Sequence, residues 1–140
     1  MSQQVHGTAV CDPLHAGAGV LIIGPSGSGK SALALQLLAY GCQLVSDDIV
    51  ALAARGADLI ASNPTQTSGI EARGIGILNA PHGKTAVLKL VVDLSESETD
   101  RLPQLRSVQY AGISLPVVHK SAFAHFPAAI LHYIRYGRMA

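Results

Sequence analysis

Tryptophan is absent from this chain, and aromatic residues make up only 4% of it. The stacked aromatic platforms that hold single-stranded nucleic acids are therefore not expected. Neither sign of charge is in excess, because ten basic and nine acidic residues leave a formal net charge of +1. Such a balance lacks the electrostatic footprint of nucleic-acid binding proteins. We expect no nucleic-acid partner.

Long hydrophobic runs are also missing. No apolar stretch approaches the roughly 18 residues that a membrane-spanning helix needs, and the first residues, Met-Ser-Gln-Gln-Val-His, lack the pattern of a secretory signal. The two cysteines, Cys11 and Cys42, have neither metal-ligand spacing nor a disulfide-rich context. We predict that both are buried free thiols, as in a reducing compartment. These features predict a cytoplasmic protein with no membrane partner.

The composition that remains is globular. Hydrophobic residues make up 49% of the 140 residues and charged residues 14%, and this length suits one domain with a real core. We expect residues 1–140 to form a single domain without a separate N-terminal domain. So small a domain with so few charges has apolar surface to cover. We therefore expect the chain to self-associate.

The most informative motif lies at residues 24–31, Gly-Pro-Ser-Gly-Ser-Gly-Lys-Ser. It satisfies the phosphate-loop pattern G-x-x-x-x-G-K-[ST], and the apolar run Gly19–Ile23 predicts the strand that must precede it. The leucine-rich run Ser31–Tyr40 predicts the helix that must follow, with Gly41 as its left-handed C-terminal residue. This context predicts a nucleoside triphosphate site.

Each part of this loop has a physical task. Backbone N–H groups at the helix N-terminus attract a polyphosphate, and glycines let the backbone approach it closely. Lys30 adds a positive charge toward the β- and γ-phosphates, and the Ser31 hydroxyl can bind Mg²⁺. The residues predicted to hold the nucleotide are Gly24, Pro25, Ser26, Gly27, Ser28, Gly29, Lys30 and Ser31.

Strands outnumber helices in the rest of the chain. Apolar runs and turn signals predict strands at Gln43–Ser46, Ile49–Ala53, Asp58–Ala61, Gly74–Leu78, Ala86–Asp93 and Leu115–Val118, with a polar loop over Ser62–Gly69. A last helix is predicted near the C-terminus, and Pro127 leaves its start open between residues 121 and 126. The pattern predicts an α/β fold with a sheet-rich core around the phosphate loop.

Two adjacent carboxylates, Asp47 and Asp48, end the strand at Gln43–Ser46. If that strand runs in the same direction as the one before the phosphate loop, both carboxylates emerge beside the γ-phosphate. One of them can then deprotonate an attacking hydroxyl while the other organises Mg²⁺. A solvated turn is the alternative interpretation, and which aspartate is the base stays open.

Glu71 and Arg73 form a second candidate pair. In an extended segment the two side chains share one face, where a metal ligand and a phosphate clamp would work together. An ordinary surface ion pair would explain the same spacing.

Together these segments resemble the catalytic domain of bacterial HPr kinase/phosphorylase, in order and spacing, over roughly residues 5–102. The resemblance rests on His6-Gly7, the phosphate loop, Leu-Val-Ser-Asp-Asp at 44–48 and Glu-Ala-Arg-Gly-Ile-Gly-Ile-Leu-Asn at 71–79. The last segment is the most specific, since generic phosphate-loop kinases lack it. The implied fold is the phosphoenolpyruvate-carboxykinase-like nucleotide-binding domain. The implied activity is ATP- and Mg²⁺-dependent phosphorylation of a serine of the phosphocarrier protein HPr by a hexameric enzyme.

The resemblance also implies roles for individual residues. It makes His6 an active-site histidine, Lys30 the phosphate-loop lysine, and Ser31 and Glu71 the Mg²⁺ ligands. Asp48, with Asp47 beside it, matches the carboxylate that accepts the serine proton. The further active-site arginine corresponds to Arg101.

The chain departs from the family pattern at three places. It begins at the catalytic domain and therefore resembles the short form of the family that is found in some alphaproteobacteria. Residues 81–84, Pro-His-Gly-Lys, replace the segment Phe-Gly-Ala-Gly, and residues 118–121, Val-His-Lys-Ser, replace the basic Gly-Arg-Asn segment linked to dephosphorylation. We therefore expect phosphorylation to dominate over phosphorolysis. A small-molecule kinase and a non-catalytic nucleotide sensor remain alternative functions.

Overall fold

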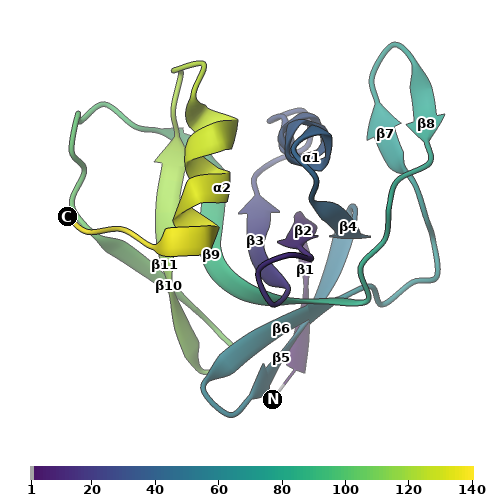
Figure 1. The fold of residues 1–140 in the computed structure, drawn as a ribbon, viewed down its shortest axis with the longest axis horizontal. Coiled ribbons are helices and arrows are strands. Elements are labelled where there is room, and N and C mark those ends of the chain that lie inside the picture. The colour runs from purple at the N-terminus through teal and green to yellow at the C-terminus, as the bar shows by residue number, and fades with distance from the viewer. Residues whose placement is uncertain (1) are drawn as a thin grey trace.

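The computed structural model describes residues 2–140 and builds them from eleven strands and two helices (Figure 1). In chain order the elements are β1 (Ser2–His6), β2 (Thr8–Asp12), β3 (Ala18–Ile23), α1 (Lys30–Ala39), β4 (Gln43–Ser46), β5 (Ile49–Arg55), β6 (Asp58–Ser62), β7 (Ile70–Ala72), β8 (Gly76–Leu78), β9 (Thr85–Ser97), β10 (Arg106–Tyr110), β11 (Ile113–Lys120) and α2 (Phe126–Tyr136).

Nine of the strands form one mixed sheet, which branches at the long strand β9. The order runs β1-β5-β6-β9-β3-β2-β4, and β11, with β10 at its edge, also pairs with β9. The first part of β9 pairs antiparallel with β6, and its later part pairs parallel with β11. The sheet therefore curls, and the β5–β6 hairpin passes beneath it in Figure 1. The remaining two strands, β7 and β8, form a separate hairpin.

The direction of the strands sets the position of the candidate site. β3 and β9 are parallel neighbours, whereas β2 lies between β3 and β4 and pairs antiparallel with both. β3, β4 and β9 therefore run the same way and end at the same edge of the sheet. The predicted βαβ crossover is correct in direction, but the two strands that it joins are not neighbours.

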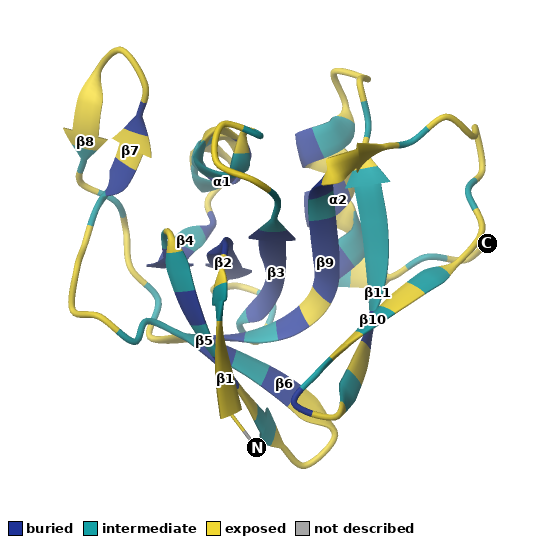
Figure 2. Cartoon of the chain, turned by 180° about the vertical axis from the view of Figure 1, so that it is seen from behind, coloured by how far each residue is buried: buried dark blue, intermediate teal, exposed yellow. Residues whose placement is uncertain are grey.

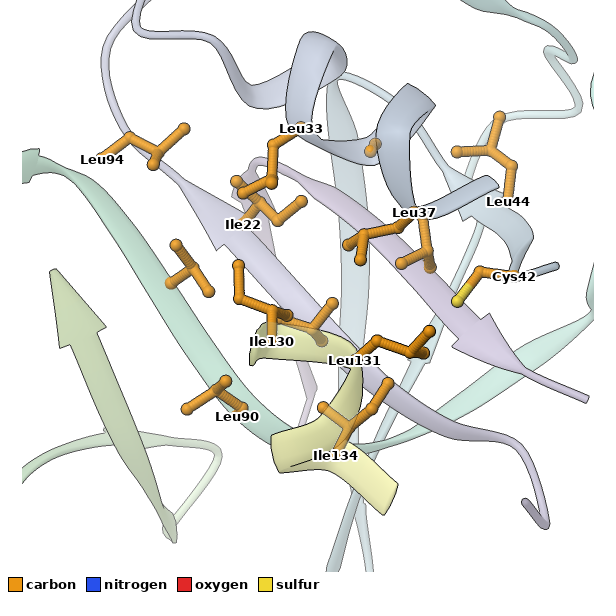
Figure 3. Packing of buried hydrophobic residues seen from close by; sticks show 14 of the residues in the cluster. Ile22, Leu33, Leu37, Cys42, Leu44, Leu90, Leu94, Ile130, Leu131 and Ile134 are labelled. Atoms are coloured by element: carbon orange, nitrogen blue, oxygen red, sulfur yellow. The ribbon is translucent and has the colours of Figure 1, made fainter. Parts of the chain in front are cut away.

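The two helices cover one face of the sheet, and the curled sheet itself encloses a second apolar cluster on the other face. Figure 3 shows the first cluster, in which side chains of α1 and α2 meet those of β3, β4 and β9. The labelled residues are Ile22, Leu33, Leu37, Cys42, Leu44, Leu90, Leu94, Ile130, Leu131 and Ile134. The second cluster joins β5 and β6 to β9 and β11. As a result β2 and β3 are almost entirely buried, and so is the middle of β9 (Figure 2).

Most elements predicted around the phosphate loop are confirmed, including the helix and the strand at Gln43–Ser46. Gly41 has a φ of 101°, as its predicted position after the helix requires. The second helix begins at Phe126 with Pro127 in its first turn, where a missing N–H breaks no helical hydrogen bond. Cys11 and Cys42 are buried free thiols, and burial raises the pKa of Cys42 to about 11.

Other elements differ from the prediction. The strand predicted at Gly74–Leu78 is wrong at its start, because a turn closed by Ile75 N–H donating to the Ala72 carbonyl (2.9 Å) delays it to Gly76. Four strands were not predicted at all, namely β1, β2, β7 and β10. Of these, β1, β2 and β7 carry residues of the candidate site.

Candidate functional site

The phosphate-loop sequence folds as a loop between β3 and α1 at the carboxyl edge of the sheet. Gly24, Gly27 and Gly29 have φ values of 149°, 82° and 102°, which side chains with a Cβ rarely adopt. At Gly24 space is also limited, since an added Cβ would lie 2.6 Å from Ser28 Oγ. Gly29 is the N-cap of α1 and no side chain caps this helix. Its first N–H groups are thus available to an anion.

Lys30 folds back over this loop. Its Nζ donates to the carbonyls of Gly24 (2.7 Å) and Pro25 (3.1 Å), which leaves one of three N–H groups for a ligand. Ser28 Oγ is buried and has no hydrogen-bond partner within residues 2–140. A buried hydroxyl without a partner is unfavourable unless a ligand or water satisfies it. The loop therefore combines backbone donors and a cation at the cavity wall, a donor set that fits a polyphosphate.

The turn between β4 and β5 carries Asp47 and Asp48. Asp47 is half-buried, and its carboxylate accepts hydrogen bonds from Ser31 Oγ (3.0 Å to Oδ1, 3.2 Å to Oδ2). Thr8 Oγ1 donates to the same Oδ1 (2.8 Å). Asp48 is exposed and has a φ of 76°, so its side chain lies at the surface of the turn. The two aspartates thus occupy distinct environments.

These groups face one cavity of about 770 Å³. Its wall joins the phosphate loop and the start of α1 to the Asp47–Asp48 turn, the polar loop after β6 and the β7–β8 hairpin. The lining residues are Ser26, Gly27, Gly29, Lys30, Ser31, Ala32, Leu35, Leu44, Ser46, Asp47, Asp48, Asn63, Thr67, Ser68, Gly69, Glu71, Ala72, Arg73, Ile75, Ile77 and His82. The structure therefore brings together three sequence-predicted groups: the loop, the two aspartates and the Glu71–Arg73 pair.

The charges around this cavity indicate whether a metal ion can bind there. Its wall carries three carboxylates, Asp47, Asp48 and Glu71, against two fixed cations, Lys30 and Arg73. A polyphosphate beside three carboxylates needs further positive charge. Within residues 2–140 no group of three His, Cys, Asp or Glu side chains is arranged to hold a metal by itself. This donor set fits Mg²⁺, which binds through one or two protein ligands together with substrate phosphates and water.

His6 and Arg101 lie outside the lining of this cavity. His6 is exposed at the end of β1 and pairs with Ile49 of β5. Because Ile49 directly follows Asp48 in the chain, His6 lies beside the aspartate turn. Arg101 lines a second cavity of about 540 Å³, together with residues such as Phe123, His125 and Tyr133. Because β9 runs parallel to β3, the segment that carries Arg101 emerges at the same edge of the sheet as the phosphate loop.

Thr8 is the site residue that the sequence did not indicate. It precedes the motif by a full strand and has no pattern of its own, and its contact with Asp47 comes from the pairing of β2 with β4. Asn63 and Thr67 of the cavity wall were likewise assigned only to a polar loop. The short apolar run Ala9-Val10-Cys11 is consistent with a buried strand, but it gives no sign that Thr8 contacts Asp47.

The chain is similar to known proteins. Residues 1–119 match the family model described as HPr Serine kinase C-terminal domain. The HPr kinase/phosphorylase of Neisseria meningitidis is 34% identical over 138 residues, covering 83% of this chain and 43% of that protein. The enzyme of the same name from Cupriavidus metallidurans is 42% identical over 113 residues, covering 72% and 35%. The chain thus spans less than half the length of these curated relatives.

A solved structure is similar over nearly the whole chain. It is described as the Hpr(Ser) kinase/phosphatase from Coxiella burnetii, and the match has a TM-score of 0.75 at 27% identity. It covers 95% of this chain and 94% of that one. The expected fold class, a sheet-rich α/β domain of the HPr kinase type, is confirmed.

Proposed function

Because this chain belongs to the HPr serine kinase C-terminal domain family, we propose that it is an ATP-dependent kinase that phosphorylates a serine of an HPr-type phosphocarrier protein. The observation that carries this proposal is the single cavity onto which the phosphate loop, the Asp47–Asp48 turn and the Glu71–Arg73 pair converge. In this proposal residues 2–140 act as one catalytic domain, since one branched sheet runs from β1 to β11.

The nucleotide phosphates would lie in the loop. The backbone N–H groups at the start of α1 and the remaining N–H of Lys30 would hold the β- and γ-phosphates. Ser31 Oγ and the carboxylates of Asp47 and Glu71 are the groups that would hold Mg²⁺. When bound, this ion neutralises phosphate charge and so eases attack by an acceptor oxygen.

Asp48 is the base in this proposal. Asp47 already accepts the hydroxyl hydrogens of Ser31 and Thr8, whereas Asp48 is exposed on the cavity wall. As the acceptor serine Oγ forms its bond to the γ-phosphorus, the bond to ADP breaks and the serine proton passes to Asp48. Arg73 would hold the transferring phosphoryl group.

His6 and Arg101 lie outside the lining of this cavity. His6 pairs with Ile49, the residue after Asp48, and Arg101 lies in the segment that follows β9, the strand parallel to β3. We assign both to the acceptor side, where the HPr surface would cover the edge. No helix within residues 2–140 is both long and apolar enough to cross a membrane. We place the enzyme in the cytoplasm as a homo-oligomer, a hexamer by family precedent.

A three-arm transfer assay tests this function. The protein is incubated with γ-labelled ATP and Mg²⁺ and with HPr, with a panel of small metabolites, or with no acceptor. Label on HPr alone supports the proposal. Label on a metabolite would replace it with a small-molecule kinase, and nucleotide binding without transfer in any arm would replace it with a nucleotide sensor. Lys30→Ala serves as the inactive control in each arm.

A further inference from the structure

Buried polar side chains are rare in this molecule. Within residues 2–140 they are Thr8, Asp12 and Ser46. Two of the three act on the same turn: Thr8 donates to the Asp47 carboxylate, and Ser46 Oγ donates to the Ile49 carbonyl. Since burying a hydroxyl is unfavourable without a partner, their concentration here points to a turn whose shape matters.

Thr8 itself is fully buried, with an exposed fraction of 0%. All five residues of β2 are buried, so a valine of the same shape would fill this position without a polar atom. The hydroxyl instead donates to Asp47 Oδ1 at 2.8 Å. Hydrogen bonds to a charged acceptor are the stronger ones. The buried Thr8 hydroxyl is therefore satisfied by the Asp47 carboxylate.

Asp47 connects Thr8 to Ser31, the last residue of the phosphate-loop motif. Ser31 Oγ has one hydrogen to donate, and it lies 3.0 Å from the oxygen of Asp47 that Thr8 also contacts. With its hydrogen directed to Asp47, the Ser31 oxygen keeps its lone pairs for a cation. Thr8 and Ser31 together fix the Asp47 carboxylate from two elements, β2 and α1.

The backbone next to Thr8 holds the same turn. Gly7 N–H donates to the Asp48 carbonyl at 3.0 Å, and a Cβ on Gly7 would lie 2.8 Å from the Ile22 carbonyl oxygen. The chain at residues 7–8 is thus wedged between β3 and the aspartate turn. This close packing leaves Thr8 Oγ1 little freedom to move away from Asp47.

We infer that Thr8 is a positioning residue for the cation that accompanies the nucleotide: it holds Asp47, which in turn orients the Ser31 hydroxyl toward that cation. This inference rests on the proposed function, because it requires that a magnesium–nucleotide complex binds in the cavity. Thr8 touches neither nucleotide nor acceptor and acts only through Asp47. The geometry that supports it is the hydrogen-bond chain from Thr8 to Asp47 to Ser31.

Calorimetric titration with a non-hydrolysable ATP analogue tests the inference, in MgCl₂ and in EDTA. Thr8→Val removes the hydroxyl and keeps the shape, Thr8→Ser keeps the hydroxyl, and Thr85→Val removes an exposed hydroxyl on β9 as a matched control. Thr8→Val should weaken binding in MgCl₂ by about 10-fold or more, the size of outer-shell effects on metal sites. Binding in EDTA should not change, and Thr8→Ser and Thr85→Val should bind like the wild type in both buffers.

A double-mutant cycle separates positioning from a general structural role. In the Asp47→Ala background, Thr8→Val should cause no further loss of affinity in MgCl₂, because coupled residues are non-additive. Thr8→Ala removes the hydroxyl a second way and should give the same magnesium-specific loss. Equal losses in MgCl₂ and EDTA, or a wild-type affinity for Thr8→Val, would overturn the inference and leave the proposed function standing. A wild-type protein that binds the analogue no better with Mg²⁺ than without it would overturn both.

Discussion

Replacing Asp48 by asparagine distinguishes the role of Asp48 from that of Asp47. Asp48 has a φ of 76°, a left-handed conformation that asparagine and aspartate tolerate better than other residues with a Cβ. Asn is therefore the substitution that preserves the turn, whereas Ala would strain it. The Asp48 carbonyl still accepts from Gly7 N–H, so the change removes only the charge and the basic oxygen. The free energy of unfolding should change by no more than about 0.5 kcal/mol.

The effect on phosphoryl transfer should be far larger. Loss of a general base typically lowers turnover by about 10²–10⁴-fold, which corresponds to about 3–5 kcal/mol of transition-state stabilisation. ATP affinity should change little, because Asp48 makes none of the side-chain hydrogen bonds that link Asp47 to Ser31. Asp47→Asn should show the opposite pattern, with a raised requirement for Mg²⁺.

The assay compares kcat for HPr phosphorylation with the dissociation constant for the ATP analogue in the same preparations. Asp58→Asn, on an exposed residue at the start of β6, controls for loss of a negative charge elsewhere. Turnover by Asp48→Asn close to that of the wild type would show that Asp48 is not the base. Equal losses in kcat and in ATP affinity would indicate that Asp48 helps to bind the metal ion and is not the base.

Four further outcomes are expected. Lys30→Ala should abolish transfer without unfolding the chain, since within residues 2–140 its Nζ donates hydrogen bonds only to loop carbonyls; the labelled-ATP assay checks the loss of transfer, and circular dichroism checks the fold. Burial alone would raise the pKa of Asp12, but hydrogen bonds from Arg135 and from Leu14 N–H hold it below its ordinary value. The stability that this carboxylate contributes is therefore present above about pH 4 and lost as pH falls through the lowered pKa, and urea unfolding of wild type and Asp12→Asn should converge at low pH. Light scattering should find an assembly larger than 14.5 kDa, because side chains such as Ile77 and Phe123 are exposed; a monomer at micromolar concentration would contradict this. Phosphorolysis of phosphoserine-HPr should be slower than the kinase reaction, and pyrophosphate release at a comparable rate would restore a bifunctional enzyme.

The phosphate loop and its flanking elements could be predicted because their signals are local. β3, the loop and α1 are defined within residues 18–39 by glycines, a lysine and an apolar run on each side of the loop. The same holds for the β5–β6 hairpin, where Gly56 follows the apolar strand at the turn. The Asp47–Asp48 turn could be placed near the loop because a short helix returns the chain to the same sheet edge.

Elements that depend on distant partners could not be predicted. β2 is inserted between β3 and β4, and nothing within residues 8–12 indicates that these two strands are its neighbours. Thr8 gained its role only through that insertion. β10 was missed although Ala111 and Gly112, both with positive φ, form the tight turn that joins it to β11, because alanine is an unusual residue for such a turn.

Phosphoryl transfer from ATP to a serine of HPr can be observed by mass spectrometry of HPr after incubation with the protein, ATP and Mg²⁺. Asp48→Asn is measured in parallel. One phosphoryl group on a single serine, formed by the wild type and nearly absent with the variant, is the predicted result. Unmodified HPr in the presence of a folded protein that binds ATP would contradict the proposed HPr kinase activity.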